Sequence, residues 1–410
     1  MRRTSRWLLI GVFVGLLVGL SVLLALRIVG REPVQNVTNA TVVVPHPSYG
    51  GGGGGSPAPV QPSTPPARVV VPVNVTINTS VEASLYAAYL QTYLQPDGGV
   101  ISNAQPVSWC PSACIGCDAD VTSEGIGRLA RVAVLEGDKA TLDKVNAYAK
   151  TVMKNPAGYL DWKLTDGVGG SCGGNNSAVD GELILIGALL KADQRWPNNG
   201  YGMDARSLMA ALKPGLINGT YLPMCMYEQG GVAAACEPTV FLGYLNLPVL
   251  KQMCAIDSFW CGVHDANKAL LIKAVQGRGI YSTYYMTQNR WAYQNAPIHP
   301  NWCLLMLSSD GDADAWSAVK PFYDQQRPLI LAGGQLCQEF NPSSGCRMAN
   351  PALDVYATWL EMAGARNDTQ LVAALRAYID KKIPTLPTTP LAGVDNFQNI
   401  ITLSGLGATH

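Results

Sequence analysis

The chain has 410 residues, of which 48% are hydrophobic and only 14% charged, and its 29 basic and 29 acidic side chains leave no formal net charge. Because there is no basic excess, nucleic acid is not an expected partner. A globular portion of about 300 residues is ample for one large core. The low charge is more typical of an exported protein than of a cytosolic one.

The first element along the chain is an apolar run from Leu8 to Val29. It is long enough to cross the ~30 Å hydrocarbon core of a membrane as a helix. Three arginines and no acidic residue precede it, which favours a cytoplasmic N-terminus at residues 1–7. A cleaved signal peptide, and therefore a secreted protein, is the alternative. We favour the uncleaved anchor at 8–29, because no small-x-small cleavage site follows the run.

Residues 30–80 form a Gly- and Pro-rich segment that contains six consecutive glycines, Gly50 to Gly55. Such a composition buries too little apolar surface to offset the entropy of ordering, so the segment is predicted to be a disordered linker. It also begins a series of Asn-x-Ser/Thr acceptors for glycosylation, which suits an extracellular location. The acceptors are Asn36, Asn39, Asn74, Asn78, Asn175, Asn218 and Asn367.

From residue 81 to residue 384 apolar residues recur at helical spacing, as in Leu183, Ile186 and Leu190. This periodicity predicts an all-α domain of ten to twelve helices with long loops between them. Residues 385–410 are rich in Thr, Pro and Gly, and we expect them to form an irregular C-terminal tail.

The chain has eleven cysteines, all between Cys110 and Cys346. Three pairs with short separations are predicted to be disulfides, each worth about 2–3 kcal/mol on the chain-entropy model. The pairs are Cys225 with Cys236, Cys254 with Cys261, and Cys337 with Cys346. The cluster Cys110, Cys114 and Cys117 has the spacing of iron–sulfur ligands, and with Cys172 it would also suit zinc. We favour disulfides there too, and expect no metal and no cofactor.

Two segments each place a carboxylate and a glycine where a loop turns into a helix. One is Ser123-Glu124-Gly125, which continues as a helical stretch to Val134, and the other is Ala178-Val179-Asp180-Gly181-Glu182, which continues to Leu190. A pair of carboxyl groups held in this way is the minimum equipment for hydrolysing a glycosidic bond.

These two segments resemble the motifs of glycoside hydrolase family 8, whose members cut β-1,4-linked glucans, xylans and chitosans. In the second motif Val179 replaces a Ser or Thr and Glu182 replaces an Asp. Weaker similarities occur at Asp97–Val100 and Glu237–Phe241, and the likeness covers roughly residues 85 to 380. The resemblance implies an (α/α)6 barrel and hydrolysis of a polysaccharide with inversion. We expect a monomer.

The resemblance implies that Glu124 is the general acid and that Asp180 holds the sugar in a distorted ring. The alternative for Glu124 is that it complements the helix N-terminus. A catalytic role would require burial or a neighbouring carboxylate, for which Asp118 and Asp120 are close in sequence. The alternative for Asp180 is a capping box with the Ser177 amide. Glu182 could serve as a structural acceptor facing the core loops.

The general base is not identified by the sequence. Family members carry a Tyr-Asp-Ala-x-Arg segment in a later helix, and the matching region here is Tyr284–Trp291. Anchoring the match on Arg290 places Thr287 where the aspartate should be, and threonine cannot deprotonate water. Candidates from another loop are Asp310, Asp312 and Asp314, although charged loops are mostly solvated turns.

Aromatic residues suggest a groove for sugars, because flat rings stack on pyranose faces. The predicted substrate-binding residues are Trp162, Tyr284, Tyr285, Arg290 and Trp291. Each aromatic is individually more often part of a core than of a binding platform.

The leading hypothesis is a membrane-anchored, extracellular, endo-acting hydrolase of β-1,4-linked polysaccharide, with cellulose-type glucan as the first choice. The second is a catalytically weakened carbohydrate-binding surface protein on the same fold, suggested by the missing aspartate near Thr287. The third is an α/α-barrel polysaccharide lyase, for which the sequence offers only loose candidates.

Overall fold

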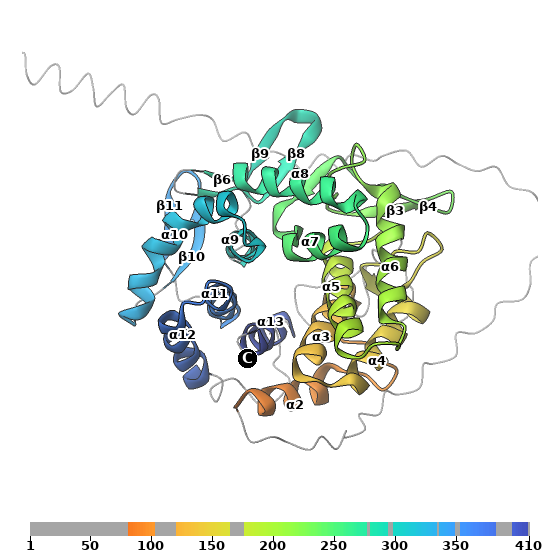
Figure 1. Cartoon of the computed structure of the whole chain (residues 1–410), viewed down its shortest axis with the longest axis horizontal. Helices are drawn as coiled ribbons and strands as arrows, with labels where there is room; N and C mark the ends of the chain where they lie inside the picture. The colour runs from red at the N-terminus through yellow and green to blue at the C-terminus, as the bar shows by residue number, and fades with distance from the viewer. Residues whose placement is uncertain are drawn as a thin grey trace, which may run out of the picture. The chain divides into compact units, whose positions relative to one another are not determined.

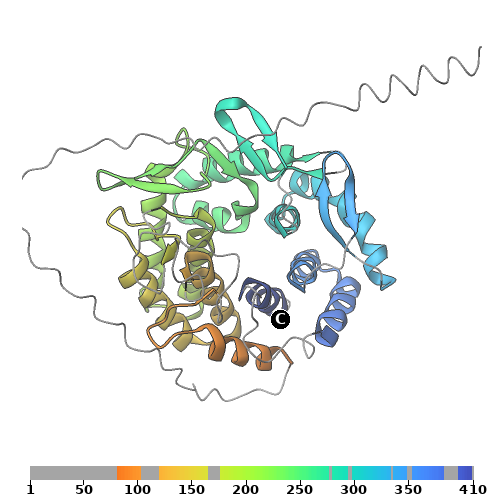
Figure 2. The ribbon, with the colours of Figure 1, turned by 180° about the vertical axis from the view of Figure 1, so that it is seen from behind.

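The computed structural model describes residues 81–102, 120–164, 176–276, 279–293, 298–333, 336–348, 353–382 and 396–408. They belong to one compact unit, Arg68–His410. Within these ranges the chain forms twelve α-helices, α2 to α13, and several short strands. Figure 1 views this unit along the axis of a ring of helices, and Figure 2 shows the same ring from behind.

Six helices form the inner wall of the ring, and each contacts the next until the last contacts the first. They are α3 (Ser123–Glu136), α5 (Val179–Arg195), α7 (Leu247–Ile256), α9 (Ile298–Asp310), α11 (Leu353–Ala365) and α13 (Asn396–Gly407). Each inner helix packs against one outer helix. The outer helices are α2 (Val81–Tyr93), α4 (Lys139–Tyr148), α6 (Tyr201–Leu212), α8 (Phe259–Ala274), α10 (Ala313–Leu331) and α12 (Thr369–Lys382). The arrangement is consistent with the (α/α)6 barrel that the resemblance predicts.

Local signals in the sequence explain where α3 begins and ends. Thr122 caps its N-terminus, because its Oγ1 accepts a hydrogen bond of 3.1 Å from the Gly125 N–H. Gly137 ends the helix in the left-handed conformation, with φ 76°. The next residue, Asp138, caps α4 by accepting from the Thr141 N–H at 3.0 Å. This tight link keeps α4 outside α3 in the ring.

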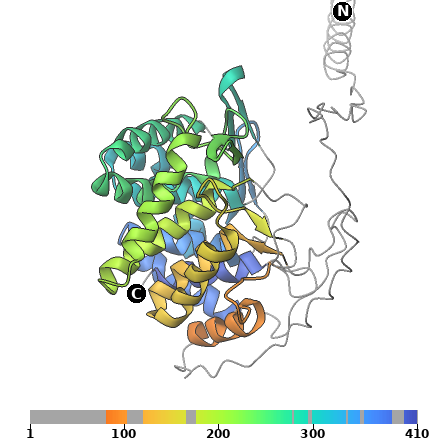
Figure 3. The same cartoon turned by 90° about the vertical axis from the view of Figure 1, so that its right-hand side faces the viewer.

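Short antiparallel pairs of strands connect the helices, which the sequence did not predict. In Figure 3 the teal hairpin β8–β9 and the blue hairpin β10–β11 lie toward the same end of the ring as the yellow pair β1–β2. The pairs are β1 (Val121–Thr122) with β2 (Lys163–Leu164), β3 (Met226–Gln229) with β4 (Val232–Ala235), β6 (Val275–Gln276) with β7 (Gly279–Ile280), and β10 (Cys337–Asn341) with β11 (Gly345–Met348). A three-stranded sheet has the order β5 (Thr239–Phe241), β8 (Thr283–Tyr285) and β9 (Arg290–Ala292).

The prediction of an irregular tail from residue 385 onward is wrong for its last part. Residues Asn396–Gly407 form α13, which packs against α11 and α3 and completes the inner wall. Ile400, Leu403 and Leu406 are fully buried, and their spacing of three residues gives the helix its apolar face. The predicted domain boundary at residue 384 therefore cuts through the ring.

The three predicted disulfides, Cys225–Cys236, Cys254–Cys261 and Cys337–Cys346, are all formed. They join β3 to β4, the end of α7 to the start of α8, and β10 to β11. Cys303 is a free thiol buried in α9, and burial raises its pKa to about 12, so it is unreactive at neutral pH. Cys110, Cys114, Cys117 and Cys172 lie outside the described residues, and the choice between disulfides and a metal site there stays a prediction.

In the part of the chain that the structure describes, no helix has both the length and the apolar character needed to cross a membrane. The predicted anchor at residues 8–29 and the linker at 30–80 lie outside the described ranges.

Candidate active site

Helices α3 and α5 approach each other so closely that only glycine fits at their crossing. A Cβ on Gly127 would lie 2.8 Å from the Gly181 carbonyl oxygen, and a Cβ on Gly181 would lie 2.7 Å from the Ser123 carbonyl carbon. The first turns of the two helices are therefore in direct contact. Glu124 and Asp180 are each the second residue of their helix, so the two motifs lie together at one end of the ring.

Asp180 is buried, and neither of its carboxyl oxygens has a hydrogen-bond partner among the described residues. Burial and the negative charge of Glu124 raise its pKa well above the usual range of aspartate, and the nearby Arg128 only partly offsets them. The capping-box interpretation is wrong, because the Ser177 amide donates to the Met226 carbonyl instead, at 2.7 Å. Asp180 lines a cavity inside the ring.

Glu124 forms an ion pair with Arg128, one turn later on α3. Its Oε1 accepts from the guanidinium at 2.7 Å (Nε) and 2.6 Å (NH2). Arg128 also lies over the Trp302 ring, 4.7 Å from its centroid. Of the predicted neighbouring carboxylates, Asp118 lies outside the described residues and Asp120 is paired with Lys163. The carboxyl group that the structure brings to Glu124 is that of Asp180.

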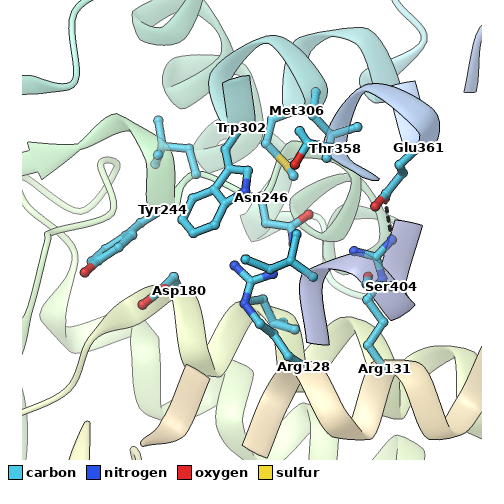
Figure 4. Close-up of a pocket in the computed structure, with 15 residues that line it drawn as sticks. Arg128, Arg131, Asp180, Tyr244, Asn246, Trp302, Met306, Thr358, Glu361 and Ser404 are labelled. Carbon is cyan, nitrogen blue, oxygen red and sulfur yellow. Dashed lines mark hydrogen bonds and ion pairs between the residues drawn. The ribbon is translucent and has the colours of Figure 1, made fainter. Parts of the chain in front are cut away.

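The cavity beside Asp180 has a volume of about 40 Å³ and is lined by side chains of inner helices and of the turn Leu242–Tyr244. This is enough for water, since one water needs ≳ 10–15 Å³ measured in this way. Figure 4 shows Arg128, Tyr244 and Trp302 around it, with the Arg131–Glu361 ion pair on the side away from Asp180. The negative charge of Asp180 and burial raise the pKa of Tyr244.

Glu182 has the structural role proposed for it as an acceptor. It is fully buried, and its Oε1 accepts from the Leu160 N–H at 3.1 Å. Two residues further on, the Trp162 carbonyl accepts from the Ser123 N–H at 2.9 Å, directly before Glu124. Glu182 thus fixes the loop that supports the start of α3. Burial raises its pKa from 4.5 to about 8.

This raised pKa predicts a dependence of stability on pH. A carboxyl group that is protonated more readily in the folded state stabilises the fold fully below pH 4.5, and the contribution is lost as pH rises through about 8. The loss amounts to roughly 5 kcal/mol for the 3.5 units between the two pKa values, at 1.36 kcal/mol per unit. Glu182→Gln cannot ionise, so its unfolding free energy should fall much less between pH 5 and pH 8.5 than that of the wild type.

Urea denaturation at a series of pH values measures this difference. Asp180 remains in both proteins, so the larger part of its own pH dependence, which comes from burial and Glu124, cancels in the comparison. Glu237→Gln is the matched control, because Glu237 is exposed and its replacement should follow the wild-type curve. Parallel curves for the wild type and Glu182→Gln would contradict the prediction.

The predicted substrate-binding aromatics fall in two places. Trp162 lies beside the start of α3, through the hydrogen bond of its carbonyl to Ser123. Tyr284 and Trp291 pack across the β8–β9 hairpin with their ring centroids 4.5 Å apart and their planes tilted by 37°, and the Arg290 guanidinium lies 4.3 Å from the centroid of the Tyr285 ring. The hairpin is joined through β5 to the turn that carries Tyr244, so it is connected to the site by a short stretch of backbone.

The region matched to the base motif is a hairpin rather than a helix. Met286–Gln288 forms the turn between β8 and β9, and Thr287 is exposed at its tip. The region therefore does not form the helix that the match to the family's motif implies.

The acidic loop after α9 is not brought to Asp180. Asp310 ends α9, about 12 Å along the helix from Trp302 at 1.5 Å per residue. Its Oδ1 lies 2.7 Å from Nε2 of His264, and this hydrogen bond raises the pKa of His264. Asp312 is held by Lys251 at 3.0 Å and by Lys268, while Asp314 lies 3.9 Å from Lys268. These carboxylates belong to an ion-pair network.

Three residues of the site were not singled out from the sequence. Arg128 could have been found from its position four residues after Glu124, the spacing at which side chains meet on a helix. Tyr244 and Trp302 carry no comparable signal, because they reach the cavity from other parts of the ring.

The sequence matches the family described as "Glycosyl hydrolases family 8" over residues 112–296, a range that contains both carboxylate motifs. The ring of helices and the paired carboxyl groups at its inner wall are consistent with this match. The match confirms the resemblance drawn from the two motifs and supports a glycoside hydrolase. No curated protein sequence matches the chain significantly.

Solved structures share the fold at low sequence identity. A novel alpha-amylase from Clostridium perfringens is similar with a TM-score of 0.65 and 19% identity, over 80% of this chain and 98% of that chain. The endo-1,4-D-glucanase from Vibrio fischeri has a TM-score of 0.60 and 16% identity, over 79% and 94%. The endo-beta-1,4-glucanase CMCax from Acetobacter xylinum has a TM-score of 0.57 and 16% identity, over 80% and 97%. Likeness at these identities establishes the fold.

Proposed function

We propose that the protein cleaves β-1,4-linked polysaccharide internally, with inversion, and that Glu124 is the general acid. Cellulose-type glucan is the first substrate to test, because two of the similar structures are named endoglucanases. The observation that supports the proposal most is the contact of the first turns of α3 and α5, which holds Glu124 beside Asp180 at the inner wall of the ring.

Each carboxyl group has a distinct role in this proposal. Glu124 protonates the oxygen of the departing sugar, and a water attacks the anomeric carbon from the opposite face of the ring. Asp180, aimed into the cavity with two oxygens available, accepts hydrogen bonds from the hydroxyls of the distorted sugar. The cavity is far smaller than the 300–1,000 Å³ of typical ligand pockets, so the polymer would lie across its mouth and not inside it.

The test uses the full-length protein and a panel of soluble glucan, xylan and chitosan oligomers. Starch is included, because one similar structure is named an alpha-amylase. Proton NMR during the first turnovers reads the configuration of the new reducing end. Fresh α-anomer from a β-linked oligomer supports inversion, whereas fresh β-anomer would contradict it.

A second candidate function is carbohydrate binding without turnover. The observation that favours it concerns the base. Among the described residues, Glu361 is the one other carboxylate that lines the cavity, and Arg131 holds it in an ion pair. Calorimetry that detects binding of an oligomer that the protein never cleaves would support this candidate over the hydrolase.

We further propose that the domain faces the outside of the cell on a single-pass anchor at residues 8–29. The three disulfides support this proposal, because such bonds persist in oxidising compartments. Protease protection of membrane vesicles, probed with an antibody to the domain, distinguishes the two orientations.

A further inference from the structure

One cation serves two carboxyl groups at the contact of α3 and α5. The Arg128 guanidinium binds Glu124 through Nε and NH2, at 2.7 and 2.6 Å from the same oxygen. The stacking of Arg128 on Trp302 fixes its direction. Arg128 forms no ion pair or hydrogen bond with Asp180 in the described part of the chain, so Glu124 alone receives its direct contact.

The carboxyl group of Asp180 receives no direct contact from a cation among the described residues. Both of its oxygens are buried without a hydrogen-bond partner in the described residues. Three other ionisable groups interact electrostatically with it: Glu124 on α3, Glu182 on the same helix as Asp180, and Tyr244 in the turn before α7. An ionised carboxylate in such a place is costly, and binding a proton removes the cost. Burial and the Glu124 charge both raise the pKa of Asp180, which agrees with this geometry.

We propose that Arg128 is a positioning residue that decides which carboxyl group holds the proton in the free enzyme, keeping Glu124 as the carboxylate and Asp180 as the neutral acid. This inference rests on the proposed role of Glu124. An ionised Glu124 cannot protonate a leaving oxygen, so a bound sugar must first break the ion pair with Arg128. The proton of Asp180 then passes to Glu124. This leaves Asp180 as a carboxylate that accepts hydrogen bonds from the sugar hydroxyls, and the total charge of the pair does not change.

Other charges around Arg128 do not compete for this role. On α11, Asp354 is half-buried, and desolvation raises its pKa to about 6 in spite of Arg128. It is therefore mostly ionised at pH 7 and adds to the negative charge around Arg128. One turn later on α3, Arg131 binds Glu361 and leaves the Glu124 pair to Arg128.

The experiment is a titration that needs no substrate. The full-length protein is labelled with ¹³C at the side-chain carboxyl carbon of aspartate only, and the NMR shifts are followed with pH. We expect one aspartate to stay protonated above pH 7 in the wild type, and its signal to be absent in Asp180→Asn. Because glutamates are unlabelled, Glu124 and Glu182 cannot contribute to the signal.

Variants of the arginine test its role. Arg128→Met should move the Asp180 titration to lower pH, because Glu124 loses its ion pair and then competes with Asp180 for the proton. Arg128→Lys should restore the wild-type titration while recovering only part of kcat, since a lysine keeps the charge but not the two-point contact. Arg131→Met, at the neighbouring arginine, is the control and should leave the Asp180 titration unchanged.

The outcomes separate this inference from the proposed function. Two results would overturn the role of Arg128. One is that Asp180 is ionised at pH 7 in the wild type. The other is that Arg128→Met lowers thermal stability but leaves the Asp180 titration unchanged. A protein that cleaves no glycan overturns the proposed function alone, because the titration is measured in its absence.

Discussion

Glu124→Gln should lower kcat on a β-linked glucan oligomer by about 10²–10⁴-fold, which is the usual contribution of a positioned general acid. Glutamine keeps the shape of the side chain but has no proton to donate to the leaving oxygen. Dissociation constants for the same oligomer should change little, because Asp180 and the aromatic residues remain. Steady-state kinetics and calorimetry on the same preparations measure the two quantities.

Asp312→Asn is the control for this experiment. Asp312 pairs with Lys251 and Lys268 in the network after α9, away from the cavity. Its replacement should leave kcat near the wild-type value. A loss of kcat comparable with that of Glu124→Gln would support Asp312 as the general base. It would also contradict the separation of the ion-pair network after α9 from the site of Glu124 and Asp180. Retained turnover in Glu124→Gln would remove Glu124 from the role of acid.

Gly181→Ala should destabilise the protein by about 1–3 kcal/mol or more and abolish most of its activity. The new methyl group would lie 2.3 Å from the Ser123 hydroxyl oxygen and 2.7 Å from the Ser123 backbone carbon. Overpacking of this kind forces backbone shifts. These shifts would move Glu124 away from Asp180, so activity should fall even at temperatures where the variant is fully folded. Chemical denaturation and kinetics on the folded fraction test both parts.

Gly262→Ala provides a matched control within another helix. Gly262 is exposed in α8, and a Cβ placed on it meets nothing within 4 Å. Alanine in such a position should stabilise the protein by up to about 1 kcal/mol through helix propensity. Equal effects of the two substitutions would show that the α3–α5 contact tolerates a side chain and would contradict the close packing described above.

Much of the fold could be predicted from local patterns in the sequence. Helical periodicity, the two carboxylate motifs and the three short-range cysteine pairs depend on residues that are near one another in the chain. The helix α13 was missed because its apolar face rests on only a few residues, such as Leu403, in a segment otherwise rich in Thr and Gly. The hairpin at Tyr284–Trp291 was mistaken for a helical motif, because a match of residue types carries no information on backbone conformation.

The site itself could be predicted only in part. Glu124 and Asp180 followed from their motifs, whereas their mutual effect depends on two glycines that allow α3 and α5 to touch. The role of Arg128 depends on Trp302, which comes from a different helix, and on the burial of Asp180. Such charge effects arise from tertiary packing, which the spacing of residues along one helix does not report.

The closing of the ring by α13 has a consequence for the order in which the molecule can assemble. The contact between α3 and α5 joins neighbouring inner helices, so it can form while much of the chain is still unfolded. The cavity also needs Ile401 and Ser404 of α13, which is separated from α3 by nearly the whole domain. Contacts between such distant segments form slowly, because a long loop must close first. A nascent chain would therefore carry its paired carboxyl groups in an open, unfinished wall, and enclosure of the cavity would be among the last events of folding.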